Sequence, residues 1–158
     1  MADRLTHLDD AGHARMVDVS AKDVTVRTAT ARCRVSIGPH VVSLLRDGTL
    51  PKGDALAVAR IAAISATKRT PELIPLCHPI ALHGVDVDVE VRDDEVAVVV
   101  TTRTADRTGV EMEALTGAAV AGLALIDMVK GVDRSAAIAE VVLLTKTGGR
   151  SGDWVREP

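Results

Sequence analysis

Apolar residues recur with a helical period between residues 108 and 133, which read TGVEMEALTGAAVAGLALIDMVKGVD. The stretch has no proline and is rich in strong helix formers, so it predicts the longest helix of the chain. At about 100° per residue, one narrow face of this helix carries mostly small side chains and a carboxylate near each end: Glu113, Thr116, Gly117, Val120, Ala124 and Asp127. Small side chains allow another backbone to come close, so this face predicts tight packing.

Three carboxylates and a lysine interrupt this apolar helix: Glu111, Glu113, Asp127 and Lys130. Acidic residues in a first turn and an Asp–Lys pair three residues apart are ordinary features of helices, and such pairs are usually solvated. A helix of this composition is nevertheless expected to be largely buried, and buried charges need partners. A functional site is therefore the alternative interpretation.

Period-two alternation of apolar and polar residues predicts the strands. A long strand with one break in register is expected in the range 16–37, and a hairpin that turns at Asp93 and Asp94 is expected in the range 82–104. The run VVLLT at residues 141–145 predicts a last strand.

Helical patterns fill the space between these strands. A short helix closed by Gly48 is expected from residue 39, and a second helix is expected from its N-cap, Asp54, to about Lys68. A further short helical piece is expected over residues 134–140. The order βαββαβ favours an α+β fold, a ferredoxin-like sandwich in which a four-stranded antiparallel sheet carries helices on one face.

A proline-rich segment, ELIPLCHPI, follows the second helix. Pro75 and Pro79 bracket Leu76, Cys77 and His78, so this segment predicts a stiff, extended loop. A lone histidine is more often structural than catalytic, but one held between prolines beside a cysteine is well placed for chemistry.

Composition narrows the class of protein. A chain of 158 residues predicts one domain, with residues 1–15 and 147–158 flexible. The net charge of −3, with no Phe or Tyr and a single Trp, argues against nucleic-acid binding. No apolar run reaches the roughly 20 residues of a membrane span, and no signal peptide is present, so a cytoplasmic protein with reduced Cys33 and Cys77 is expected.

Lysines are scarce in this chain compared with arginines. Only five of the 19 basic residues are lysines: Lys22, Lys52, Lys68, Lys130 and Lys146. A compact ammonium with a tunable pKa is one reason to keep a lysine where arginine is the usual cation. Lys146 opens KTGGRSG, whose glycines could form a backbone nest for a phosphate, although Gly-rich tails are usually only mobile.

Four segments together resemble, in order, the molybdenum-cofactor biosynthesis protein C (MoaC) family, the cyclic pyranopterin monophosphate synthases: MVDVS, KGDALAVARIAAISATKRTPELIPLCHPI, TGVEMEALTGAAVAGLALIDMVKGVD and KTGGRSG. The resemblance implies a ferredoxin-like subunit, a homohexamer built from three dimers, and active sites at a subunit interface. It also implies the reaction, a lyase step in which a cyclised dihydroguanosine triphosphate, made by a partner radical-SAM GTP cyclase, becomes cyclic pyranopterin monophosphate and releases diphosphate.

The resemblance also implies the site. The residues that match the family's motifs are Lys52 in KGD, His78 in LCHP, Glu111 and Glu113 in GVEME, Asp127 and Lys130 in DMVK, and Lys146 in KTGG. Their neighbours Leu76, Cys77 and Met112 are expected to contact the substrate as well.

Roles for these residues follow as hypotheses. Lys52 and Lys146 would hold phosphate oxygens, helped by the amides of Gly148 and Gly149. Asp127 and Lys130 would carry out acid–base catalysis.

His78 and Glu113 would orient the purine-derived ring and transfer protons, while Cys77 would be structural. No resident cofactor is expected, although Mg²⁺ could accompany the triphosphate.

Two alternatives to this reading remain. A metal could be held by His78, Glu111, Glu113 and Asp127, against which the nearby lysines argue. The chain could instead be a ligand-binding regulatory module, which would bind a nucleotide without turning it over.

Overall fold

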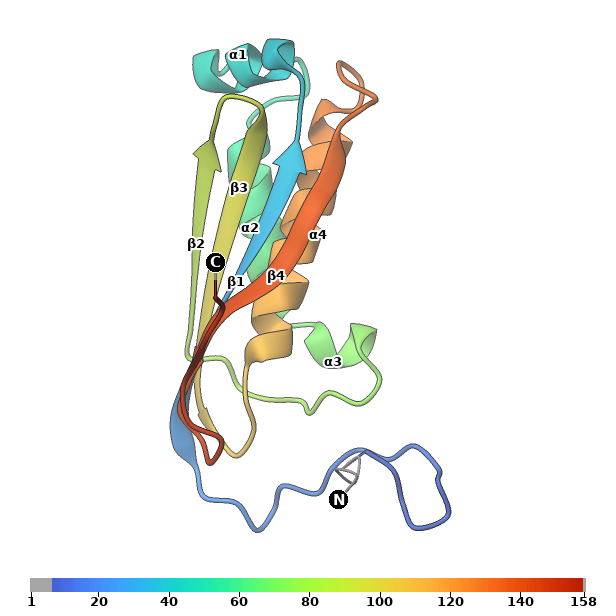
Figure 1. The fold of residues 1–158 in the computed structure, drawn as a ribbon. Helices are drawn as coiled ribbons and strands as arrows, with labels where there is room; N and C mark the ends of the chain where they lie inside the picture. Colours follow the sequence, from blue (N-terminus) through green and yellow to red (C-terminus); the bar gives the residue numbers. More distant parts are fainter. Residues whose placement is uncertain (1–6, 158) are drawn as a thin grey trace.

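The computed structural model describes residues 7–157 (Figure 1). Within these residues an open antiparallel sheet has the strand order β2-β3-β1-β4-β5, and helices α2 and α4 pack together on one face of it. Helix α1 lies at one end of the sheet, and α3 is a short helix beside α4. The elements are β1 Thr25–Ser36, α1 Pro39–Asp47, α2 Ala55–Thr67, α3 Thr70–Leu73, β2 Gly84–Val91, β3 Glu95–Asp106, α4 Glu111–Val129, β4 Ala137–Thr147 and β5 Trp154–Val155.

Helix α4 packs closely against its neighbours through two glycines. A Cβ atom at Gly117 would lie 2.7 Å from Cγ2 of Thr67 and 3.2 Å from the carbonyl oxygen of Ala63, both in α2. A Cβ atom at Gly122 would lie 2.6 Å from Sγ of Cys33 in β1. Tight packing of the small-residue face is therefore confirmed at Gly117, where two helix backbones meet.

The ends of the first two long helices follow the sequence. Oδ1 of Asp54 accepts a hydrogen bond of 2.9 Å from the Ala57 amide, so Asp54 is the N-cap of α2 as predicted. Gly48, with a φ of 65°, ends α1 in the left-handed conformation that glycine adopts at low cost.

Strand β1 is central in the sheet and pairs with β3 in one continuous register from Thr25 to Ser36. Alternate side chains on its helix-facing side are fully buried: Ala29, Ala31, Cys33 and Val35. The predicted break in register is confined to the pairing with β4, where shifts occur after Thr30 and after Arg34.

The opposite face of the sheet carries a network of ion pairs. Arg34 contacts Glu95 and Glu140 at 3.2 Å each, and Arg32 contacts Glu140 at 2.8 Å. These side chains are half-buried, and a network of this kind is held more firmly than an isolated surface pair.

The fifth strand corrects the predicted four-stranded sheet. Strand β5 pairs with the edge of β4 through Lys146 opposite Trp154 and Thr145 opposite Val155. Residues 147–157, expected to be flexible, turn back here as a hairpin, and the mobility of this segment stays a prediction. Residues 1–6 and 158, which shared that expectation, lie outside the described residues.

Two predicted elements were wrong. Residues 134–140 are not helical, because β4 begins at Ala137 and pairs with the edge of β1, which outweighs the local helical preference of this alanine-rich piece. The first strand does not begin at residue 16 but at Thr25, and the alternating Val17 and Val19 line a pocket instead.

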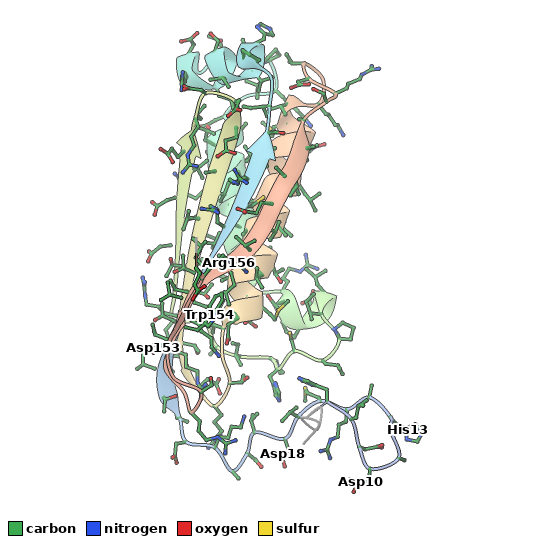
Figure 2. The ribbon with its side chains drawn as sticks, viewed as in Figure 1. Asp10, His13, Asp18, Asp153, Trp154 and Arg156 are labelled. Carbon is green, nitrogen blue, oxygen red and sulfur yellow. The ribbon has the colours of Figure 1, made fainter. Side chains whose placement is uncertain are left out.

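The N-terminal segment, residues 7–24, runs across the end of the sheet as an irregular chain. A bridge between Leu8 and Ala14 and two backbone amides bound by the Asp9 carboxylate close a small loop at its start. Figure 2 shows this loop, with His13 labelled, projecting away from the sheet.

Helix α4 is also the one described helix long and apolar enough to cross a membrane by length and composition alone. The core helix of a soluble protein passes the same test, and α4 packs on β1, β3, β4 and α2. Its apolar character is therefore accounted for by the core.

Candidate functional site

The predicted site residues lie in two groups at opposite ends of α4. Glu111, Met112 and Glu113 begin the helix, whereas Asp127 lies in its last turn and Lys130 just beyond it. At a rise of 1.5 Å per residue, Glu111 and Asp127 are about 24 Å apart along the axis. The structure therefore does not bring the predicted residues into one cluster within a single chain.

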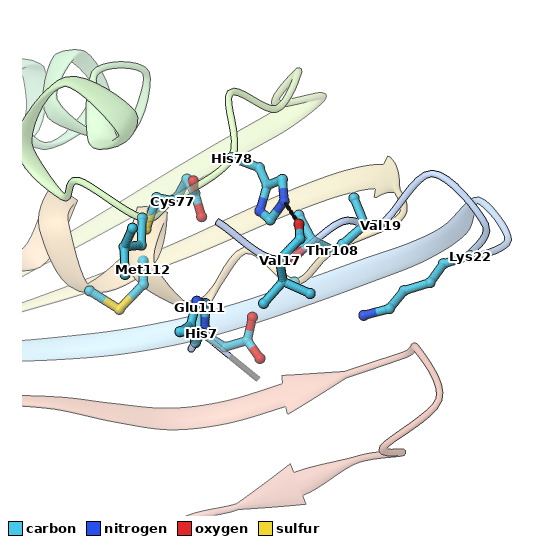
Figure 3. Close-up of a pocket in the computed structure, with 12 residues that line it drawn as sticks. His7, Val17, Val19, Lys22, Cys77, His78, Thr108, Glu111 and Met112 are labelled. Atoms are coloured by element: carbon cyan, nitrogen blue, oxygen red, sulfur yellow. Dashed lines mark hydrogen bonds between the residues drawn. The ribbon is translucent and has the colours of Figure 1, made fainter. Parts of the chain in front are cut away.

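The first group surrounds a cavity of about 420 Å³, which we term the N-end pocket (Figure 3). The loop after α3 contributes Leu76, Cys77 and His78, and the start of α4 contributes Glu111, Met112 and Glu113. The remaining lining residues are His7, Val17, Val19, Lys22, Thr108 and Gly109.

The proline-bracketed loop is irregular, as the sequence predicts, and it places His78 at this pocket. Residues 74–83 have no regular structure, and only the short helix α3 precedes them. Nε2 of His78 lies 2.6 Å from the carbonyl oxygen of Val17.

Glu113 is the buried carboxyl group of the N-end pocket, with 3% of its surface exposed. Burial raises its pKa to about 7, and the charge of Glu111 adds to the rise, while a hydrogen bond to its own backbone amide opposes it. A carboxyl group with this pKa can both donate and accept a proton near neutral pH.

The two cysteines are not activated thiols. Burial raises the pKa of the Cys77 thiol, and the nearby Glu113 carboxylate raises it further. The pKa of Cys33 rises to about 11, chiefly because it is buried in the core. Nucleophilic cysteines need a lowered pKa, so a structural role fits Cys77.

Lys146 lies at the rim of the same end. Its Nζ lies 3.3 Å from Oε1 of Glu111 and donates a hydrogen bond of 3.0 Å to Oγ of Ser151. Gly148 and Gly149 both have positive φ, whereas a backbone nest alternates αR and αL residues, and the Gly148 amide already donates to Oδ1 of Asp153 at 3.0 Å. The predicted phosphate nest therefore has one of its two amides occupied in this structure.

The second group, at the C-terminal end of α4, is an ion triad. Nζ of Lys52 lies 2.5 Å from Oδ2 of Asp127, and Nζ of Lys130 lies 2.8 Å from Oδ1. Lys52 also donates to the backbone carbonyl of Asp127 at 2.9 Å, and a cavity of about 340 Å³ adjoins the three side chains.

These two lysines control the ionisation of Asp127. Hydrogen bonds from Lys130 first and Lys52 second lower the pKa of Asp127 to about 2. The carboxylate is therefore ionised at neutral pH and cannot donate a proton there, which leaves the two ammonium groups as the proton donors of the triad. All three side chains are at least half exposed, so the expectation that these charges are buried fails for the single chain.

Sequence reasoning missed the contribution of the N-terminal segment. His7, Val17, Val19 and Lys22 all line the N-end pocket, although residues 1–15 were expected to be a tail and residues 16–24 part of a strand. A signal was present, because Lys22 is one of only five lysines and follows the segment MVDVS.

The metal alternative does not fit one chain. Within residues 7–157, no three His, Cys, Asp or Glu side chains are arranged so that they could hold a metal ion. The candidate ligand Asp127 stands about 24 Å along α4 from Glu111, and two ammonium groups bind it.

Comparison with known proteins adds to this geometry. The model of the MoaC family matches residues 16–149, which include both groups of predicted site residues and residues 16–24 of the N-terminal segment. The chain belongs to the MoaC family. The match begins at Met16 of the N-terminal segment and ends in the hairpin after Lys146.

Curated relatives in this family match nearly the whole chain. The cyclic pyranopterin monophosphate synthase of Streptomyces coelicolor is 62% identical over 154 residues, which cover 98% of this chain and 91% of the relative. The protein of the same name from Nocardioides is 60% identical over 97% of this chain and 96% of its own length. That of Peptoclostridium acidaminophilum is 45% identical, covering 96% and 97%.

Proposed function

We propose that this MoaC-family protein is a cyclic pyranopterin monophosphate synthase, a lyase of molybdenum-cofactor biosynthesis. Its substrate would be the cyclised dihydroguanosine triphosphate, and its products cyclic pyranopterin monophosphate and diphosphate. The observation that carries the proposal is identity of up to 62%, over nearly the full length, with proteins named for this activity. The substrate would come from a radical-SAM GTP cyclase, and we place the reaction in the cytoplasm.

We further propose that each active site combines the two ends of α4 from different subunits. The helix between the ends packs against the sheet and α2, so one small molecule cannot contact both groups of the same chain. A two-fold interface that sets the C-terminal end of one α4 beside the N-end pocket of another would join them. A homohexamer made of three such dimers is the assembly that we propose.

The outer surface of the helix layer is consistent with such an assembly. Val58 and Ile61 of α2 and Leu123 of α4 are exposed by 41%, 65% and 58%. Exposed aliphatic side chains on neighbouring helices are typical of surfaces that a partner covers. The subunit itself would be ferredoxin-like, because the order β2-β3-β1-β4 with α2 and α4 on one face is that of the βαββαβ sandwich.

Within this site the chemistry divides between the two groups. The ammonium groups of Lys146, Lys52 and Lys22 would bind the triphosphate, and Glu111 would keep Lys146 in place. Glu113 would exchange a proton with the ring near neutral pH, and Lys130 would be the proton donor of the triad. A substrate hydroxyl closes the cyclic phosphate as diphosphate leaves, so no enzyme nucleophile is needed.

Release of diphosphate and pterin from the cyclised triphosphate tests the proposed activity directly. We expect turnover by the wild type and a loss of about 100-fold or more in Lys146→Ala, the size expected when a positioned charged group is removed. Lys68→Ala is the matched control, because Lys68 is an exposed lysine at the end of α2 in neither group.

Nucleotide binding by the wild type without any product would contradict the proposal and favour the regulatory module. Equal activity of Lys146→Ala and Lys68→Ala would remove Lys146 from the site.

A further inference from the structure

The N-terminal segment forms one wall of the N-end pocket and is anchored there by two hydrogen bonds. Nε2 of His78 is hydrogen-bonded to the Val17 carbonyl at 2.6 Å, and Nε of Arg107 donates a hydrogen bond to the Lys22 carbonyl at 2.9 Å. The side chains of Val17 and Val19 are half-buried in the pocket wall. Figure 3 shows the hydrogen bond between the His78 ring and the backbone oxygen of Val17, with Lys22 further along the same segment.

The contact with Val17 determines which ring nitrogen of His78 carries the proton. A carbonyl oxygen only accepts hydrogen bonds, so Nε2 must be the N–H donor. In the neutral ring, Nδ1 then has the free lone pair. Within residues 7–157, no hydrogen bond to Nδ1 of His78 is present, so this nitrogen is available to a ligand.

We propose that the Val17 carbonyl is a positioning group that fixes His78 in the Nε2–H tautomer, so that Nδ1 accepts a hydrogen bond or a proton from an N–H or O–H group of the ligand. That the ligand is the cyclised nucleotide rests on the proposed function, whereas the tautomer does not. The N-terminal segment thus supplies a backbone group that determines which ring nitrogen of His78 donates a hydrogen bond and which accepts one.

The surroundings of His78 support this assignment. Asp18 follows Val17 directly, and its carboxylate accepts from the Ser20 amide at 2.8 Å, whereas the hydrogen-bond partner of Nε2 is the Val17 carbonyl. The pKa of Asp18 is lowered, chiefly by that amide. Across the pocket, protonated Glu113 offers a donor, so His78 and Glu113 would present complementary groups to one ring.

Nuclear magnetic resonance of the full chain with ¹⁵N-labelled histidine tests the tautomer. At a pH where the ring is neutral, we expect Nε2 of His78 to show the shift of a protonated nitrogen and Nδ1 that of an unprotonated one. The spectrum of His78→Gln assigns the signals. The opposite tautomer in the wild type, or equal shifts of the two ring nitrogens, would by itself overturn the proposal.

The role of the segment is tested by loosening its anchors. Val17→Gly combined with Val19→Gly keeps the carbonyl but removes both side chains from the pocket wall, and we expect the two nitrogen shifts of His78 to move toward each other. Val24→Gly is the matched control, because Val24 is 56% exposed and does not line the pocket. Arg107→Gln loosens the other anchor and serves if the glycine pair does not fold.

Unchanged His78 shifts in the folded glycine pair and in Arg107→Gln would contradict the role of the segment.

Diphosphate release separates this inference from the proposed function. We expect turnover of the glycine pair to fall about tenfold, less than the roughly 100-fold or more that a proton-transfer group contributes, because His78 itself is kept. A wild type with the Nε2–H tautomer but no turnover would overturn the proposed activity and leave the tautomer in place.

Discussion

Glu113 shows how one buried carboxyl group couples stability to pH. Its pKa is about 7 in the folded chain, well above the ordinary value of 4.5, chiefly because burial disfavours the charged form. The folded state therefore binds its proton more tightly than the unfolded state does. The stabilisation from the protonated form is complete below pH 4.5 and is lost as pH rises through about 7.

Replacing Glu113 by glutamine should remove this dependence. Glutamine keeps the shape but cannot ionise, so we expect Glu113→Gln to be more stable than the wild type by about 3 kcal/mol at pH 8 and about equal to it at pH 4. Urea unfolding of both proteins at the two pH values measures the difference. A stability gap that is the same at pH 4 and pH 8 would show that Glu113 ionises normally.

Helix α4 carries candidate residues at both of its ends, and its packing depends on residues without side chains. A Cβ atom at Gly122 would come within 2.6 Å of the Cys33 sulfur and 3.1 Å of Cδ1 of Ile138, both in neighbouring strands. Because these are core atoms, they can move aside only by disturbing the packing of the sheet.

We therefore expect Gly122→Ala to lower the free energy of unfolding by about 1–3 kcal/mol, the usual cost of overpacking a core. Gly131→Ala is the control, because an added Cβ there meets nothing within 4 Å and Gly131 is not among the glycines with positive φ. Thermal and urea unfolding of the two variants make the comparison. Equal stability of both would show that α4 can move away from the sheet at little cost.

The same helix shows what sequence can and cannot predict about an element. The stretch predicts α4 well, because its helical period and its lack of proline agree with its burial. The helix predicted for residues 134–140 was wrong, because the local helical preference is weak and pairing with the edge of β1 makes this stretch part of β4. The strand predicted at Val17 and Val19 was wrong for a related reason, because alternating valines fit a pocket wall as well as a strand.

At the scale of the whole molecule, the sequence predicts candidate site residues but not how subunits bring them together. The motif residues were assigned through a family resemblance. The structure adds the contacts within each group, such as Asp127 with Lys130 and Glu111 with Lys146. Their separation could have been read from the sequence, because Asp127 follows Glu111 by 16 residue steps on one helix, about 24 Å at the usual rise. Which surfaces meet between subunits is a property of the assembly, and a pattern along one chain does not contain it.

The central claim is that one active site uses the two ends of α4 from different subunits, and complementation between two inactive variants tests it most directly. His78→Ala disrupts the group at the N-end pocket, and Asp127→Ala disrupts the ion triad. The rate of diphosphate release by each variant alone should therefore fall about 100-fold. Co-assembly of the two chains in equal amounts should restore about one quarter of wild-type activity, because about one site in four then takes both intact halves. Activity no higher than that of the separate variants, in mixed oligomers shown to contain both chains, would contradict the claim and place the whole site within one subunit.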